Sequence, residues 1–235
     1  MIKIENTEVF GWEAAIRGMR NPMNSWHLSD SYWGLLEDES PINPSDEIFF
    51  FVGENDLKLM RNLAKAGSDH AKYLRMINVT VDITAPLYWW KEFDTYKVGT
   101  VANSCSTMHK IHDKEFELDD FSHEHLISDW IGDNVESFAF DGIGNPIAPM
   151  DVLNIIIHSL NVNREAFLKT KDKKYWWQMI QLLPSSYNQK RTVQLNYQVL
   201  LNMYRARKNH KLDEWREFCK WIETLPYFKE VLLDA

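Results

Sequence analysis

The sequence has few cysteines and no long apolar stretch. Its 235 residues include only Cys105 and Cys219, which excludes a disulfide framework and favours a reducing compartment. The longest apolar runs, such as residues 48–52, are far shorter than the roughly 20 residues that cross a bilayer. The first residues also lack the cationic and then apolar order of a secretory signal. We therefore expect a soluble, cytoplasmic protein that does not bind a membrane.

Positive charge is also scarce, with 26 basic residues against 34 acidic ones and a net charge of −8. A surface that binds a polynucleotide needs a dense basic face, so we expect no nucleic-acid polymer as a partner, whereas a small anion is allowed. Glycine and proline number only nine and eight, and they do not gather into a linker. No internal repeat occurs either, and we expect a single domain over residues 1–235.

Several common catalytic motifs are missing. The sequence contains no Walker loop and no dinucleotide-binding glycine pattern. Cys105 and Ser106 have His109 nearby, but no Gly-x-Ser-x-Gly turn surrounds them and no second motif supplies an orienting acid. His109 and His112, with His123 and His125 behind them, fit no common zinc spacing, and we interpret them as surface residues. P-loop and Rossmann proteins are excluded, and neither a hydrolase nor a metal site is expected.

Tryptophan, in contrast, is abundant. Ten tryptophans occur, four of them in the adjacent pairs at residues 89–90 and 176–177. Such rings pack well in a core or a subunit interface, and they also form walls against flat ligands. Composition leaves both interpretations open.

Residue patterns predict a helix-rich α+β protein with a small, mainly antiparallel sheet. The clearest strand covers residues 78–84, where Val79, Val81 and Ile83 share one face, and residues 1–10 predict an edge strand. Pro86 is predicted to begin a helix that extends to Lys97. The other predicted helices cover residues 13–20, 55–64 capped by Asn55, 68–74 capped by Ser68, 152–160 capped by Asp151, 163–167 capped by Asn163, 175–183, 192–208 and 212–224. We predict a polar loop over residues 21–46 and a hairpin turn at Asp141–Gly142.

A polar run follows the predicted helix that begins at Pro86. Gly99 leads into Asn103, Ser104, Cys105, Ser106 and Thr107. Together they bring many hydrogen-bond donors to one place, as an oxyanion or a phosphate requires.

Two segments resemble the flavin-dependent thymidylate synthase (ThyX) family. The first contains Gly67–His70, the strand, the helix from Pro86 to Lys97, and Asn103–Ser106. The family has a Glu-His pair, a strand, a helix that ends in Arg-His-Arg, and a loop with Asn-Glu-x-Ser. The second segment covers residues 196–207, with His210 and Trp215 following. It is similar to the family's C-terminal helix, which begins with Asn-x-Arg and ends with Leu-Arg before His-Ala-Gln-Trp.

The sequence departs from the family pattern in several positions. Thr95-Tyr96-Lys97 stands where the family has Arg-His-Arg, so a hydroxyl and one ammonium replace two guanidinium groups. The following loop is one residue longer, Ser104 replaces a glutamate, and Gln198 replaces the first arginine of the helix. Arg164 and Arg191 are unassigned arginines that are candidates to compensate.

The resemblance implies a ThyX-like fold and a role for six residues. His70, Lys97, Asn103 and Asn196 would lie near bound FAD, while Ser106 and Arg207 would hold the nucleotide substrate. Structural interpretations stay open, because Arg207 also fits a solvated helix face and His70 also fits a packing or capping role.

The implied activity is methyl transfer to a pyrimidine deoxynucleotide, from dUMP to dTMP. The family uses reduced flavin as hydride donor, with NADPH and methylenetetrahydrofolate as co-substrates, and builds its sites between the subunits of a homotetramer. Because the Arg-His-Arg motif is lost, a catalytically silent descendant that binds or sequesters a nucleotide stays an alternative. A purely structural assembly protein is a third.

Overall fold

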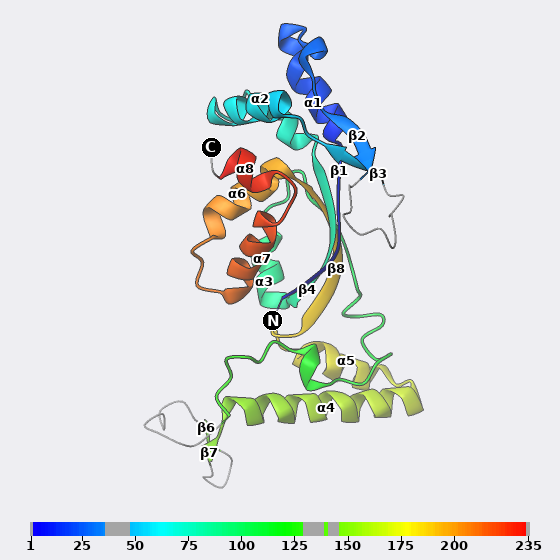
Figure 1. The fold of residues 1–235 in the computed structure, drawn as a ribbon. Coiled ribbons are helices and arrows are strands. Elements are labelled where there is room, and N and C mark those ends of the chain that lie inside the picture. The colour runs from blue at the N-terminus through cyan, green and yellow to red at the C-terminus, as the bar shows by residue number, and fades with distance from the viewer. Residues whose placement is uncertain (1, 36–47, 129–138, 141–145, 234–235) are drawn as a thin grey trace, which may run out of the picture. The chain divides into compact units, whose positions relative to one another are not determined.

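The computed structural model describes residues 2–35, 48–128, 139–140 and 146–233, and Figure 1 shows its fold. The main sheet has four strands in the order β1-β4-β8-β5. These strands are β1 (Lys3–Phe10), β4 (Asn78–Pro86), β8 (Asn188–Asn196) and β5 (Val101–Ser104). The edge position of β1 confirms the predicted edge strand. The alternation along β4 is also confirmed, since Val79, Val81 and Ile83 are buried.

Two short antiparallel hairpins accompany the main sheet. Strand β2 (Tyr32–Leu35) pairs with β3 (Ile48–Phe51), and β6 (Ala139–Phe140) pairs with β7 (Pro146–Ile147). Residues 36–47 of the predicted polar loop and the predicted turn at Asp141–Gly142 lie outside the described residues. The helix-rich α+β class with a small, mainly antiparallel sheet is confirmed. A single domain over residues 1–235 stays a prediction.

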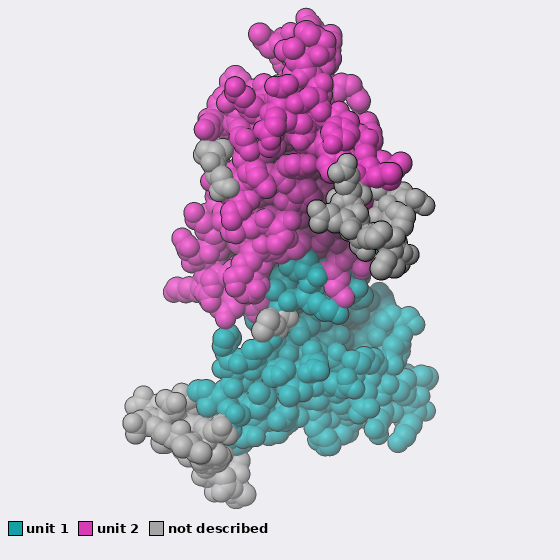
Figure 2. All heavy atoms as spheres, in the orientation of Figure 1, with its two compact units in different colours: residues 1–4, 82–95, 103–192 teal, residues 5–81, 96–102, 193–235 magenta. Residues whose placement is uncertain are grey.

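The chain divides into two compact units, coloured separately in Figure 2. Unit 1 contains residues 1–4, 82–95 and 103–192. Its helices are α3 (Leu87–Phe93), η4 (Leu118–Asp120), α4 (Pro149–Thr170) and α5 (Lys173–Leu182). Helices α4 and α5 pack side by side (Figure 1). The core beneath them consists of Ile111, Phe116, Phe121, Leu153, Leu160 and Met179.

Unit 2 contains residues 5–81, 96–102 and 193–235. Its helices are α1 (Trp12–Arg20), η1 (Asn21–Met23), η2 (Trp26–Leu28), α2 (Glu54–Lys65), η3 (Lys72–Arg75), α6 (Tyr197–Arg207), α7 (Asp213–Glu223) and α8 (Phe228–Leu232). Short helix η3 contacts both α1 and α6, while α6 packs on α7 and α2 on α8. Among the described residues of both units, no helix is long and apolar enough to span a membrane.

The predicted helix over residues 192–208 is wrong in its first part. Residues 192–196 belong to strand β8, where Val193 and Leu195 are buried while Thr192 and Gln194 are exposed. This alternation has the period of a strand. The helix begins only at Tyr197, because the Asn196 side chain accepts a hydrogen bond from the Val199 amide and caps it.

Other helix boundaries also differ from the predictions. Residues 68–74 form turns and the short η3 rather than a helix capped by Ser68. Helix α3 ends at Phe93, so Lys97 lies beyond it. Helix α4 is continuous over the two helices predicted there, because the Asn163 amide donates back to the Ser159 carbonyl instead of capping a new helix.

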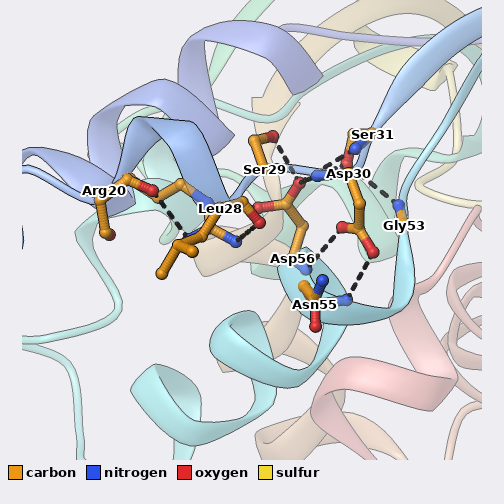
Figure 3. A network of polar contacts seen from close by, with 9 residues as sticks. Arg20, Leu28, Ser29, Asp30, Ser31, Gly53, Asn55 and Asp56 are labelled. Atoms are coloured by element: carbon orange, nitrogen blue, oxygen red, sulfur yellow. Dashed lines mark hydrogen bonds and ion pairs between the residues drawn. The ribbon is translucent and has the colours of Figure 1, made fainter.

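A carboxylate far along the chain caps α2, contrary to the predicted Asn55 cap. The oxygens of Asp30 accept hydrogen bonds from the backbone amides of Asn55 and Asp56, at 2.9 and 3.1 Å (Figure 3). An acceptor at this end of a helix satisfies amides that have no partner within the helix. Asp30 therefore caps α2, which is the role that the sequence pattern predicted for Asn55.

The side chain of Asp56 is the centre of a buried polar network (Figure 3). Its Oδ1 lies 2.6 Å from Nε of Arg20. Its Oδ2 accepts hydrogen bonds from the hydroxyls of Ser29 and Ser31, both at 2.7 Å. Burial by itself would raise the pKa of Asp56, but the hydrogen bonds from Ser29, Ser31 and Arg20 and the charge of Arg20 hold that pKa below its usual value. The network ties α1, the segment before β2 and α2 together.

Candidate functional site

The chain segment of residues 96–102 lies against α6 at two points. At one end, the Tyr96 hydroxyl accepts a hydrogen bond from Nε of Arg207 at 3.0 Å. At the other end, Gly99 has a φ of +76°, and a Cβ there would stand 3.1 Å from the side-chain Nδ2 of Asn196. Lys97 lies between these two contacts and is exposed. Two of the predicted site residues, Arg207 and Asn196, therefore contact this segment, and a third, Lys97, belongs to it.

Aromatic rings surround the guanidinium group of Arg207. It lies 4.8 Å from the ring centroid of Trp215 and 5.7 Å from that of Tyr96. The two rings meet edge to face at 6.1 Å. A planar cation held against ring faces is well suited to a phosphate or a planar ligand. The motif comparison predicts a role for Arg207 and none for Tyr96, which stands where the family has histidine, although Tyr96 orients the arginine.

The remaining unit 2 candidate, His70, lies in the turn between α2 and η3. Its side chain is exposed, and its backbone amide donates to the Gly67 carbonyl at 3.0 Å. This hydrogen bond involves the backbone only, so it does not engage the imidazole.

Asn103 and Ser106 belong to unit 1, and both are exposed. Asn103 lies in β5. Ser106 Oγ accepts hydrogen bonds from the backbone amides of Met108 and His109, at 3.2 and 2.9 Å. A hydroxyl that accepts in this way keeps its own proton as a donor. The polar run predicted to bind an anion therefore ends in a turn that fixes the Ser106 hydroxyl.

No family model and no curated protein matches the sequence, but solved structures do match. Two structures of ThyX from Helicobacter pylori with FAD and dUMP align with TM-scores of 0.63. One is 16% identical and covers 100% of this chain and 98% of that chain. The other is 15% identical and covers 99% and 98%. A UMP/dUMP methylase, PolB from Streptomyces cacaoi bound with 5-Br UMP, aligns with a TM-score of 0.58 and 11% identity over 98% of this chain and 90% of that chain.

The chain has the ThyX-like fold. The fold predicted from the resemblance of the two sequence segments is therefore confirmed. The roles of the six candidate residues stay predictions.

Within this ThyX-like fold, two buried polar atoms close to the candidate residues lack hydrogen-bond partners in the described part of the chain. They are Oε1 of Gln198 and Oγ1 of Thr100. Gln198 lies on the first turn of α6, and Thr100 follows Gly99. Buried polar atoms are normally hydrogen-bonded to protein, water or a ligand. Gln198 is a departure from the family motif, and no sequence motif points to Thr100.

The two arginines considered as compensating groups are engaged elsewhere in unit 1. Arg191 lies over the ring of Trp90 at 4.2 Å and donates to Asp94 at 2.8 Å. Arg164 donates to the backbone carbonyls of His112 and Asp113. Both arrangements stabilise unit 1 itself. Across the described ranges, no three histidine, cysteine or acidic side chains are placed to hold a metal ion.

Asn196 has a capping role that two substitutions can separate from a role in ligand binding. Asn196→Asp keeps an oxygen for the Val199 amide, whereas Asn196→Ala removes it. We expect the alanine variant to lose about 1 kcal/mol of unfolding free energy, and the aspartate variant to stay within about 0.5 kcal/mol of the unmodified protein. Urea unfolding measures both values. Equal losses in the two variants would contradict the capping role.

Proposed function

We propose that this protein is a flavoprotein methyltransferase that acts on a pyrimidine deoxynucleotide, converting dUMP to dTMP. The observation that carries the proposal is the Arg207 guanidinium held between Tyr96 and Trp215 in a ThyX-like fold. The solved structures with this fold include one with FAD and dUMP and a UMP/dUMP methylase.

The residues near α6 fit a flavin. Gln198 offers a buried acceptor and Thr100 a buried hydroxyl, and both lack partners in the described ranges. A flavin ring has both N–H donors and carbonyl acceptors, so it can satisfy both atoms. His70, Lys97, Asn103 and Asn196 are proposed to complete the FAD site. When bound and reduced, FAD supplies hydride, with NADPH as the reductant and methylenetetrahydrofolate as the one-carbon donor.

In this proposal the protein binds and orients its ligands rather than attacking them. Arg207 pairs with the anionic nucleotide, and the fixed Ser106 hydroxyl donates a hydrogen bond to it. No protein nucleophile is required, which agrees with the missing hydrolase motifs. We also propose that the protein is cytoplasmic and that homotetramer formation completes the sites.

Flavin retention tests the proposed function directly. Purified protein is mixed with FAD and desalted, and its absorption spectrum is recorded; we expect a retained yellow cofactor. We also expect FAD plus dUMP to raise the melting temperature, because a ligand that binds only the folded state stabilises it. Protein that keeps no flavin and gains no stability from the two ligands would exclude the enzyme.

A catalytically silent nucleotide-binding protein is the alternative. This alternative is favoured because Lys97 is the only positively charged residue of Thr95-Tyr96-Lys97. The side chain of Lys97 is also exposed. A tritium-release assay separates the two functions. The silent protein would gain stability from dUMP without releasing tritium, whereas a structural assembly protein would show neither effect.

A further inference from the structure

A cleft of about 710 Å³ opens within unit 2 beside the first two turns of α1. The end of β1, the β2–β3 hairpin and the turn between α7 and α8 form its other walls. Small-molecule sites have volumes of about 300–1,000 Å³, so the cleft is large enough for a ligand. None of the six predicted site residues lines it. The cleft therefore shares no residue with the proposed flavin and nucleotide site.

The walls of the cleft are aromatic and held in place. The indole N–H of Trp33 donates to Oε1 of Glu13 at 2.7 Å, and the ring meets Phe50 edge to face at 5.1 Å. Elsewhere in the lining, the indole N–H of Trp221 donates to the Thr7 hydroxyl at 3.1 Å. Trp33 is nevertheless 56% exposed. Its ring surface is therefore available to a flat ligand, and little side-chain entropy is lost when the ligand binds.

Arg17 brings a positive charge to the same cleft. It lies one helical turn after Glu13 on α1, and its side chain is exposed. In the described ranges, no hydrogen bond or ion pair engages its guanidinium group. By contrast, Arg20, the next arginine of α1, is buried and bound to Asp56 and two backbone carbonyls. An arginine beside aromatic walls recognises carboxylate, sulfonate or phosphate groups.

We propose that this cleft binds a flat aromatic anion, meaning a ring system that carries one carboxylate, sulfonate or phosphate group. The ring would stack on Trp33 and its neighbours, and the anionic group would pair with Arg17. Glu13 limits the affinity, because its carboxylate repels the anion, while its hydrogen bond to Trp33 holds the wall in position.

The fluorescent probe 8-anilinonaphthalene-1-sulfonate tests the proposal on the full chain, because it combines aromatic rings with one anionic group. We expect saturable binding to one site. Arg17→Gln should weaken that binding about tenfold, since it removes a charge-assisted contact. Glu13→Gln should strengthen it a few-fold, because the repulsion disappears while the amide oxygen still accepts from Trp33.

Two controls make the result specific. Arg75→Gln removes an exposed arginine that does not line the cleft, and it should leave binding unchanged. N-phenyl-1-naphthylamine lacks the sulfonate, and Arg17→Gln should not alter its binding. The proposal is overturned if Arg17→Gln binds the sulfonate as well as the unmodified protein does, or if Arg75→Gln weakens binding equally.

Competition identifies the anionic group that the cleft prefers. We expect either 2-naphthoate or 2-naphthyl phosphate to displace the probe at least tenfold better than uncharged 2-naphthol does. The stronger competitor distinguishes a carboxylate ligand from a phosphate ligand. Equal displacement by all three compounds, or displacement by none, would contradict an anion site.

Discussion

The Asp56→Ala variant is expected to lose about 3–5 kcal/mol of unfolding free energy, the loss typical of breaking a buried ion pair. Arg20 and Asp56 are 4% and 0% exposed. Removing the carboxylate leaves the Arg20 guanidinium buried without a counter-charge, and it also leaves the hydroxyls of Ser29 and Ser31 without their acceptor. The stability measured by urea unfolding should therefore fall by far more than for a surface ion pair.

The matched control is Glu217→Ala. Glu217 pairs with Lys220 at 2.7 Å, but the two side chains are 43% and 70% exposed. Exposed pairs contribute less than about 1 kcal/mol, so this variant should change stability little. If Asp56→Ala were as mild as Glu217→Ala, the buried ion pair between Arg20 of α1 and Asp56 of α2 would not stabilise the fold.

Acid should remove the same contribution from the unmodified protein. Because the pKa of Asp56 is lower in the folded than in the unfolded state, its stabilisation is present above the unfolded pKa of about 3.9 and is lost as the pH falls through the lower, folded value. The stability difference between the unmodified protein and Asp56→Ala should therefore be largest near neutral pH and shrink in acid. A stability difference that stays constant as the pH falls below about 3.9 would contradict the lowered pKa of Asp56 in the folded state.

The local patterns of the sequence predicted the elements whose form depends on near neighbours. Alternating apolar residues identified β4, and the helix predicted over residues 13–20 corresponds to α1. The Arg20–Asp56 pair escaped prediction because 36 positions separate its members. The cap of α2 by Asp30 escaped for the same reason, since nothing near Asn55 in sequence indicates a carboxylate from another segment.

The candidate site was predicted in part. The resemblance pointed to Arg207 and Asn196, and the structure places both at α6 beside residues 96–102. The end of strand β8 was missed because residues 192–196 run directly into α6 and were assigned to that helix, although Val193 and Leu195 alternate with the exposed Thr192 and Gln194. Tyr96 was missed as a partner because it lies 111 positions from Arg207. In the motif comparison, Tyr96 appears only as the residue that replaces a histidine.

The Arg207→Lys variant is expected to bind dUMP about 10–100-fold more weakly than the unmodified protein. A hydrogen bond to a charged group contributes about 1.5–3 kcal/mol, and each 1.4 kcal/mol is a factor of ten in affinity. Lysine keeps the charge but has neither the planar fork nor the ring stacking of Arg207 on Trp215. Isothermal titration with dUMP measures the change, and the melting temperature without ligand shows whether the fold is intact.

Two further variants decide whether Arg207 binds the nucleotide or only packs. Arg205→Lys changes an exposed arginine of the same helix, and it should leave dUMP affinity within about twofold of the unmodified protein, because ordinary surface substitutions have small effects. Tyr96→Phe keeps the ring but removes the hydroxyl that accepts from Nε of Arg207, so it should weaken dUMP binding less than Arg207→Lys does. A purely structural arginine would give another result, in which Arg207→Lys lowers the melting temperature and leaves dUMP affinity unchanged. That result would remove Arg207 from the proposed nucleotide site.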